Sequence, residues 1–167
     1  MPVRLDFNAL VPLHYQDLYR YAYRLSGNSI DAEDLVQETF CSAQGNQEQL
    51  RDSAKVKSWL FSILYHAFLL HQRRKRKLRY VTWEQELDHV PMAEPELPAV
   101  NSTQLQAGLM QVPEDYRAVL ILYYFEDFSY RDMATQLRIP IGTVMSRLAR
   151  AKQFLKHLLS KHVEHDE

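Results

Sequence analysis

Residues 129–150 read SYRDMATQLRIPIGTVMSRLAR, a pattern that predicts two short helices separated by a turn. Ser129 is a favourable helix N-cap, and apolar side chains recur after it at helical spacing, at Met133, Ala134 and Leu137. Arg138, Ile139 and Pro140 then break the helix, because proline lacks the N–H of a helix interior and biases the preceding residue towards an extended backbone. The stretch therefore predicts a helix-turn-helix.

The second helix of this motif is expected from about Gly142. Its apolar stripe consists of Val144, Leu148, Ala151 and Leu155. Off the stripe lie small, polar and basic residues, namely Thr143, Ser146, Arg147, Arg150 and Lys152. Such a helix suits the DNA major groove, since its N-terminal amides favour phosphate and an arginine can form two hydrogen bonds with guanine. The spacing alone leaves an ordinary helical hairpin with a solvated basic face as the alternative.

Composition favours an all-α chain. Of its 167 residues, 46% are hydrophobic and only 4 are glycine, which is few for a sheet with many tight turns. Apolar residues recur at three-and-four spacing along most of the chain, and no long stretch alternates. No apolar run approaches the roughly 18 residues of a membrane span, and the N-terminus lacks the pattern of a signal peptide. We therefore expect a cytoplasmic protein without membrane insertion.

The sequence contains few candidates for catalytic or metal-binding residues. The single cysteine, Cys41, excludes an intrachain disulfide and a multi-cysteine zinc site, and we expect a small buried side chain. His66 and His71 lack metalloprotease spacing, and the sequence contains neither a Gly-rich phosphate loop nor a nucleophile beside a plausible base. Three histidines near the C-terminus are expected to form a solvated tail: His157, His162 and His165. We predict no enzymatic activity, no metal site and no cofactor.

Basic and acidic residues are concentrated in different segments of the chain, although the formal net charge is only −1. Six of the seven residues 73–79 (RRKRKLR) are basic, whereas residues 84–97 contain five carboxylates and no Lys or Arg. Residues 81–103, which include this acidic segment, contain three prolines and lack sustained periodicity, so they are predicted to be a flexible linker. It would join two small helical domains, residues 1–80 and 104–162, and a tail would follow at 163–167. A near-neutral chain should bind DNA weakly by itself.

The first domain is expected to contain three helices, at about 7–25, 31–43 and 56–76. In the second of these, which Asp31 could cap, the polar residues Glu33, Asp34, Gln37 and Glu38 face outward. A plain solvated surface is the interpretation that the residues alone favour for this acidic face. The third helix combines Trp59 and other aromatics with a basic end, which suits single-stranded DNA, although an aromatic core stripe followed by a solvated end is equally consistent.

Three segments, in this order and spacing, resemble one family: DAEDLVQETF (31–40), KSWLFSILYHAFLLHQRRKRK (57–77) and VPEDYRAVLILYYFEDFSYRDMATQLRIPIGTVMSRLARAK (112–152). They look like the conserved regions of extracytoplasmic-function sigma factors, the small promoter-specificity subunits of bacterial RNA polymerase. The resemblance implies core polymerase and promoter DNA as partners and an anti-sigma factor as regulator. It reverses the solvated-face interpretation of the acidic helix, which in this family docks on the clamp helices of the largest polymerase subunit.

The resemblance also implies a role for individual residues. The expected polymerase-binding residues are Asp31, Asp34, Leu35, Gln37, Glu38 and Phe40. Those expected to capture the minus-ten element are Lys57, Trp59, Ser62, Tyr65, His66, Arg73 and Arg74. At the minus-thirty-five element the residues expected to face bases are Thr143, Met145, Ser146, Ala149 and Arg150. Phosphate contacts are expected from Ser129, Tyr130, Arg131 and Arg147.

Several residues depart from the family pattern. Tyr65 and His66 replace a segment that commonly contains asparagine, and Leu70 stands where aspartate or asparagine is frequent. Met145 replaces a usual Lys or Arg and offers only apolar contact, for example to a thymine methyl group. The competing interpretation is a helix-turn-helix regulator of the response-regulator or quorum-sensing type, which would leave the acidic and basic helices of the first domain without a role.

Overall fold

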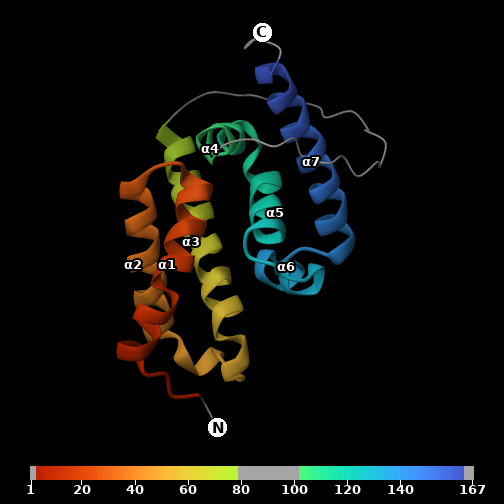
Figure 1. The fold of residues 1–167 in the computed structure, drawn as a ribbon. Coiled ribbons are helices and arrows are strands. Elements are labelled where there is room, and N and C mark those ends of the chain that lie inside the picture. Colours follow the sequence, from red (N-terminus) through yellow and green to blue (C-terminus); the bar gives the residue numbers. More distant parts are fainter. Residues whose placement is uncertain (1–2, 79–101, 164–167) are drawn as a thin grey trace. The chain divides into compact units, whose positions relative to one another are not determined.

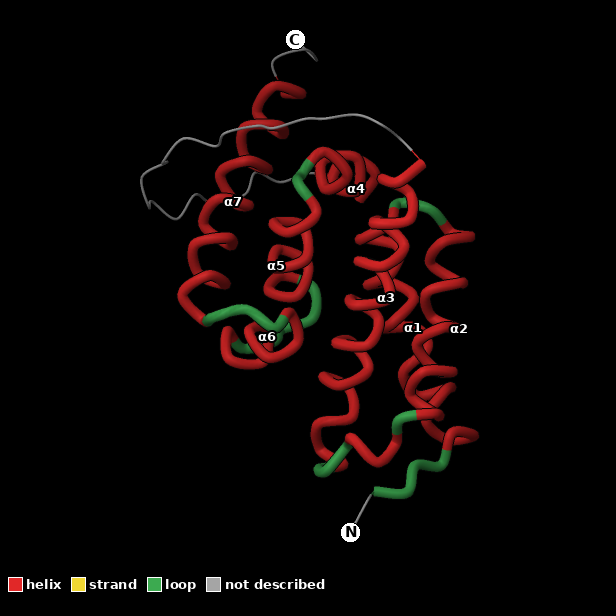
Figure 2. The backbone as a smooth tube through the Cα atoms, turned by 180° about the vertical axis from the view of Figure 1, so that it is seen from behind, coloured by secondary structure: helices red, strands yellow, loops and turns green. Residues whose placement is uncertain are grey.

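The computed structural model describes residues 3–78 and 102–163, whose regular secondary structure is helical, with no strand among them (Figures 1 and 2). The prediction of an all-α chain is therefore confirmed. They fall into two compact units, of which the first contains α1–α3 and the second contains α4, α5, α7 and the start of α6. The predicted linker lies outside the described residues up to residue 101, as does the tail from residue 164.

The first unit is a three-helix bundle of α1 (Phe7–Ser26), α2 (Ser29–Gly45) and α3 (Val56–Leu78). The short 3-10 helices η1 (Gln47–Gln49) and η2 (Ser53–Lys55) connect α2 to α3. Both α1 and α3 pack against α2. The largest fully buried side chains of the bundle form one apolar core, which contains Leu18, Tyr21, Leu25, Leu35, Leu60, Phe61, Leu64 and Phe68.

After the turn that follows α1, the helix α2 begins earlier than predicted. Gly27 ends α1 in the left-handed conformation, at φ 70°, which glycine adopts without a steric penalty. Asn28 follows at once as the N-cap of α2, and its Oδ1 accepts hydrogen bonds from the backbone N–H groups of Ile30 and Asp31. The helix thus begins before Asp31, which lies in the first turn, where a carboxylate stabilises the helix dipole.

The prediction that Cys41 is buried is wrong, because the structure exposes it. Cys41 follows Asp34 and Gln37 at intervals of three and four residues, so it lies on the same outward face of α2. His14 of α1 has the opposite environment, since it is buried and its Nε2 has no hydrogen-bond partner among the described residues. Burial lowers the pKa of His14, and although Asp17 opposes this shift, the imidazole is favoured in its neutral form.

The second unit consists of α4 (Ser102–Gln111), α5 (Glu114–Tyr124), the start of α6 (Tyr130–Leu137) and α7 (Ile141–Val163). Both α4 and α5 pack against α7. Gly108 allows the close approach of α4, because a Cβ atom at this position would lie 2.9 Å from Leu155 Cδ1. The predicted stripe of α7 is confirmed, since its four residues are buried: Val144, Leu148, Ala151 and Leu155.

The buried guanidinium of Arg117 on α5 closes the end of α4. Its Nε donates to the carbonyl of Leu109 at 2.7 Å, and its Nη2 donates to the carbonyls of Val112 at 2.9 Å and Met110 at 3.2 Å. A helix leaves its last carbonyls without intrahelical partners, so this side chain supplies donors to the end of α4, where the Leu109 carbonyl also accepts from the backbone N–H of Val112 at 3.1 Å. Burial lowers the pKa of Arg117, which Glu114 partly offsets.

Lys152 of α7 does not face outward as predicted, because it is only 5% exposed. Its Nζ lies 4.8 Å from the ring centroid of Tyr123 and 5.6 Å from that of Tyr124. The two tyrosines of α5 therefore hold the ammonium by cation–π contacts while its aliphatic stem is covered. Among the described helices, none combines the length and apolar character needed to cross a membrane.

Candidate nucleic-acid interface

The helix-turn-helix consists of α6, a short turn and the start of α7. Ser129 caps α6, since its Oγ accepts from the backbone N–H of Asp132 at 3.1 Å, as the sequence predicted. Arg138 adopts a left-handed conformation at φ 54° and ends the helix. The carbonyl of Pro140 then accepts from the backbone N–H groups of Thr143 and Val144, so α7 begins one residue before the predicted Gly142.

The residues expected to face bases lie on the side of α7 opposite its buried stripe. Met145 is 47% exposed and Ser146 is also exposed, whereas Thr143, Ala149 and Arg150 are half-buried. The Ser146 hydroxyl donates to the carbonyl of Thr143 at 3.1 Å. The first two turns of α7 thus present a small, mostly uncharged surface, as close approach to base edges requires.

The two arginines of this surface reach towards the first turn of α5. Arg147 Nη2 lies 4.0 Å from Asp115 Oδ2, and Arg150 Nη1 donates to the Tyr116 hydroxyl at 3.4 Å. Both contacts are long, so they constrain the guanidinium groups only weakly. Each guanidinium retains donors for another acceptor.

The residues expected to contact phosphates around the start of α6 differ in their exposure and in the contacts that they already make. The Ser129 hydroxyl is already used, because it caps α6 and donates to Asp132 Oδ2 at 2.8 Å. The Tyr130 ring packs 5.8 Å from that of Tyr123, and Arg131 is exposed. Arg131 is therefore an exposed cation of this set.

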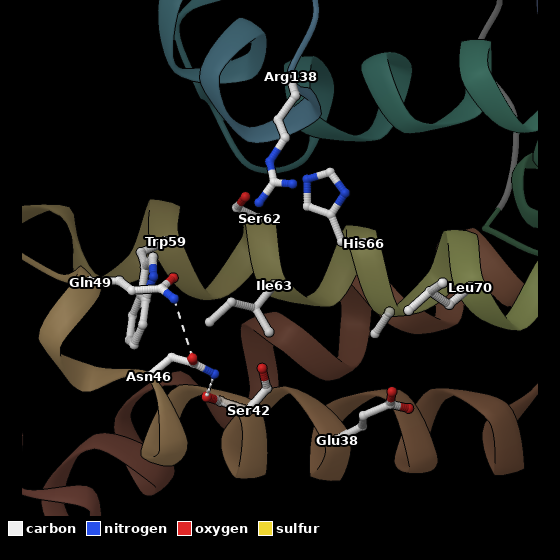
Figure 3. Close-up of a pocket in the computed structure, with 11 residues that line it drawn as sticks. Glu38, Ser42, Asn46, Gln49, Trp59, Ser62, Ile63, His66, Leu70 and Arg138 are labelled. Carbon is white, nitrogen blue, oxygen red and sulfur yellow. Dashed lines mark hydrogen bonds between the residues drawn. The ribbon is translucent and has the colours of Figure 1, made fainter.

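A groove between α2, η1 and α3 contains residues from two of the predicted sites (Figure 3). Apolar side chains of α3, namely Ile63, Ala67 and Leu70, lie along it, and the half-buried Trp59 lies beside Gln49 at one end. Its other lining residues include Glu38, Ser42, Asn46, Ser62 and His66. Gln49 donates to Asn46, and Asn46 in turn donates to the carbonyl of Ser42. Sequence reasoning missed the amides of Asn46 and Gln49, which the segment after Gly45 brings opposite Trp59.

The other predicted minus-ten residues have different environments. Lys57 Nζ lies 3.3 Å from Asp17 Oδ2 of α1, so this cation is already paired within the bundle. Tyr65 is buried, and its ring makes an edge contact with that of the half-buried His66. Arg73 and Arg74 are exposed at the basic end of α3.

The acidic face of α2 contains exposed groups and groups that are paired with α3. Asp34 and Gln37 are exposed, Phe40 is half-buried and Leu35 is part of the core. Asp31 Oδ2 lies 2.6 Å from Lys75 Nζ, and Glu38 Oε2 lies 2.7 Å from His71 Nε2. Among the described residues, no group of histidine, cysteine and carboxylate side chains could hold a metal ion.

Known proteins match both units of the chain. Residues 10–78 match the family model described as Sigma-70 region 2, and residues 102–155 match that described as Sigma-70, region 4. The ECF RNA polymerase sigma factor SigM of Mycobacterium tuberculosis is 33% identical over 93% of this chain and 78% of its own length. SigE of Mycolicibacterium smegmatis, another ECF RNA polymerase sigma factor, is 35% identical over 94% of this chain, which spans 63% of SigE.

A solved structure agrees with these matches. The sigma factor RpoE, in complex with the anti-sigma factor NepR from Bartonella quintana, superposes with a TM-score of 0.75 and 30% sequence identity. The match covers 93% of this chain and 97% of that one. Two matched regions in the order of the family, and a relative matched over most of both lengths, lead to one conclusion. The chain belongs to the ECF family of RNA polymerase sigma factors, which are transcription initiation factors and not enzymes.

Proposed function

We propose that this chain binds core RNA polymerase in the cytoplasm, directs initiation at a limited set of promoters and is restrained by an anti-sigma factor. The presence of sigma region 2 and sigma region 4 in one chain carries this proposal. A helix-turn-helix regulator would account for the second unit alone. The match to sigma region 2 also explains the first unit, which the regulator interpretation leaves without a role. The complex of RpoE with an anti-sigma factor supports the proposed mode of control.

The exposed face of α2 is the proposed site of polymerase binding. Asp34 and Gln37 offer a carboxylate and an amide to a basic partner surface, and they are exposed in the chain alone. Leu35 would contribute indirectly, because its burial anchors α2 to the bundle. Phe40 adds a half-buried ring beside the polar groups. We assign the partner surface to the clamp helices of the largest polymerase subunit.

The groove and the basic end of α3 are the proposed site of minus-ten capture. Trp59 could stack with an unpaired base while the amides of Asn46 and Gln49 lie within the same groove. Ser62 and His66 line the groove further along α3, and the remaining predicted residues would act outside it: Lys57, Tyr65, Arg73 and Arg74. Buried Tyr65 would position its neighbour His66, whereas the exposed arginines would follow the phosphates.

The surface of α7 is the proposed reader of the minus-thirty-five element. Thr143, Met145, Ser146, Ala149 and Arg150 would face bases, and Ser129, Tyr130, Arg131 and Arg147 would lie along the phosphates. The exposed thioether of Met145 cannot donate or accept strongly, so it favours a thymine methyl group over a guanine. Promoter preference should therefore depart at this position from relatives that carry Lys or Arg.

The proposal is tested with the purified chain and purified core polymerase. The chain should co-purify with core polymerase and direct specific initiation, whereas the chain alone should protect promoter DNA poorly. The near-neutral charge is the reason, because non-specific affinity grows with the number of phosphates that the protein neutralises. If the chain alone protected a specific site tightly and did not bind core polymerase, the regulator interpretation would replace ours.

Arg150→Ala is expected to weaken promoter use by about 1–3 kcal/mol, in a way that depends on the upstream sequence. Among the residues proposed to face bases, Arg150 carries the guanidinium, which can form two hydrogen bonds with guanine, and its contact with Tyr116 leaves donors available. Initiation rates on templates with single base-pair changes in the upstream element measure the effect. Lys156→Ala, an exposed cation further along α7, is the matched control. An equal loss on every upstream sequence would make Arg150 a phosphate contact.

A further inference from the structure

Two short polar contacts, an ion pair and a histidine–carboxylate hydrogen bond, join α2 to α3 inside the first unit. Lys75 Nζ lies 2.6 Å from Asp31 Oδ2, and His71 Nε2 lies 2.7 Å from Glu38 Oε2. The carboxylates belong to the face assigned to core polymerase, while Lys75 and His71 belong to the end of α3 where Arg73 and Arg74 are assigned to DNA. Each pair therefore links one proposed surface to the other.

Both pairs remain accessible to competing partners. The side chains of Glu38 and Lys75 are 43% and 53% exposed, so neither pair is sealed in the bundle. Glu33 and Asp34, on the same helix, are also exposed, but they make no ion pair with any described residue. Within one helix, α2 thus carries two carboxylates that are paired with α3 and two that are not.

We infer that Asp31 and Glu38 occupy the cationic end of α3 in the chain alone, so that polymerase binding to α2 and DNA binding to α3 favour each other. The inference rests on the proposed roles of these two surfaces. A polymerase cation that binds Glu38 or Asp31 competes with His71 or Lys75 for the carboxylate. The released side chain can then bind a phosphate, and by linkage a bound phosphate must strengthen polymerase binding by the same factor.

Neutralising the paired carboxylates tests the first half of this coupling. Asp31→Asn/Glu38→Gln and Glu33→Gln/Asp34→Asn remove the same charge from the same helix, so long-range repulsion of DNA changes equally. Fluorescence anisotropy with a labelled single-stranded oligonucleotide, at about 0.15 M salt where the Debye length is about 8 Å, measures binding by the chain alone. Neutralising the paired residues should tighten binding about two- to fivefold more than neutralising the unpaired ones.

The second half concerns binding to core polymerase without DNA. Lys75→Gln should strengthen it about twofold, because Asp31 is released for the partner, whereas Arg74→Gln, the loss of an exposed cation on the same turn, should not. Equal oligonucleotide affinities of the two carboxylate variants would overturn the inference and leave the proposed function intact. A different result would be that the wild-type chain binds core polymerase, but neither it nor any variant binds the oligonucleotide, even at low salt. In that case both the inference and the assignment of α3 to DNA would fail. Thermal unfolding of each variant verifies that the bundle is intact.

Discussion

Replacing Arg117 by methionine should destabilise the second unit by about 3–5 kcal/mol, the largest loss of stability that we expect from one substitution in this chain. The side chain is only 5% exposed and donates to three backbone carbonyls at the end of α4. Methionine fills a similar volume but donates no hydrogen bond, so the carbonyls of Met110 and Val112 lose this donor, whereas that of Leu109 keeps the backbone N–H of Val112. Each unsatisfied buried acceptor costs about 1–3 kcal/mol.

Urea unfolding of the full chain, followed by circular dichroism, measures this loss. Part of the helical signal should disappear at a lower urea concentration than in the wild-type chain. Arg117→Lys should be intermediate, because one ammonium cannot reproduce the spread of donors on a guanidinium. Arg131→Met removes an exposed arginine from the same unit and should change stability by less than about 0.5 kcal/mol. If Arg117→Met unfolded at the same urea concentration as the wild-type chain, the hydrogen bonds from Arg117 would not be needed to stabilise the end of α4.

The role of Arg117 illustrates what local sequence patterns cannot reveal. Ser129 and Pro140 were sufficient to predict the helix-turn-helix, since a cap and a helix-breaking residue act on their own neighbours. Arg117, however, acts on carbonyls that come within reach only when the chain turns back between α4 and α5. Lys152 was misplaced for the same reason, because its burial depends on the two tyrosines that α5 brings to α7.

The candidate sites show the same division between local and distant information. Periodicity predicted that Asp34 and Gln37 face outward, and both are exposed. It could not reveal which carboxylates of α2 are paired, because Glu38 and Asp31 meet partners 33 and 44 residues further along the chain. The groove beside Trp59 was also missed, because its amides come from Asn46, which follows α2, and from Gln49 of η1, and they face Trp59 only after the bundle has folded.

Asp34, one of the two carboxylates of α2 without an ion-pair partner among the described residues, leads to the second large effect, since Asp34→Arg should nearly abolish binding to core polymerase. Asp34 is exposed and makes no ion pair with any described residue, so its reversal should leave the bundle stable. At an interface with a basic partner, the new guanidinium faces like charges, and such a juxtaposition costs several kcal/mol. A loss of about 3 kcal/mol corresponds to roughly a hundredfold weaker binding.

Competition between labelled wild-type chain and each variant for core polymerase measures the loss, and promoter-directed transcription should fall in parallel. Glu48→Arg provides the matched control, because Glu48 is an exposed carboxylate of η1 outside the proposed face. Its reversal changes the net charge equally, so general electrostatic attraction is held constant between the two variants. If both competed as well as the wild-type chain, polymerase would bind elsewhere on the first unit. If both lost binding alike, net charge rather than the face of α2 would determine the affinity.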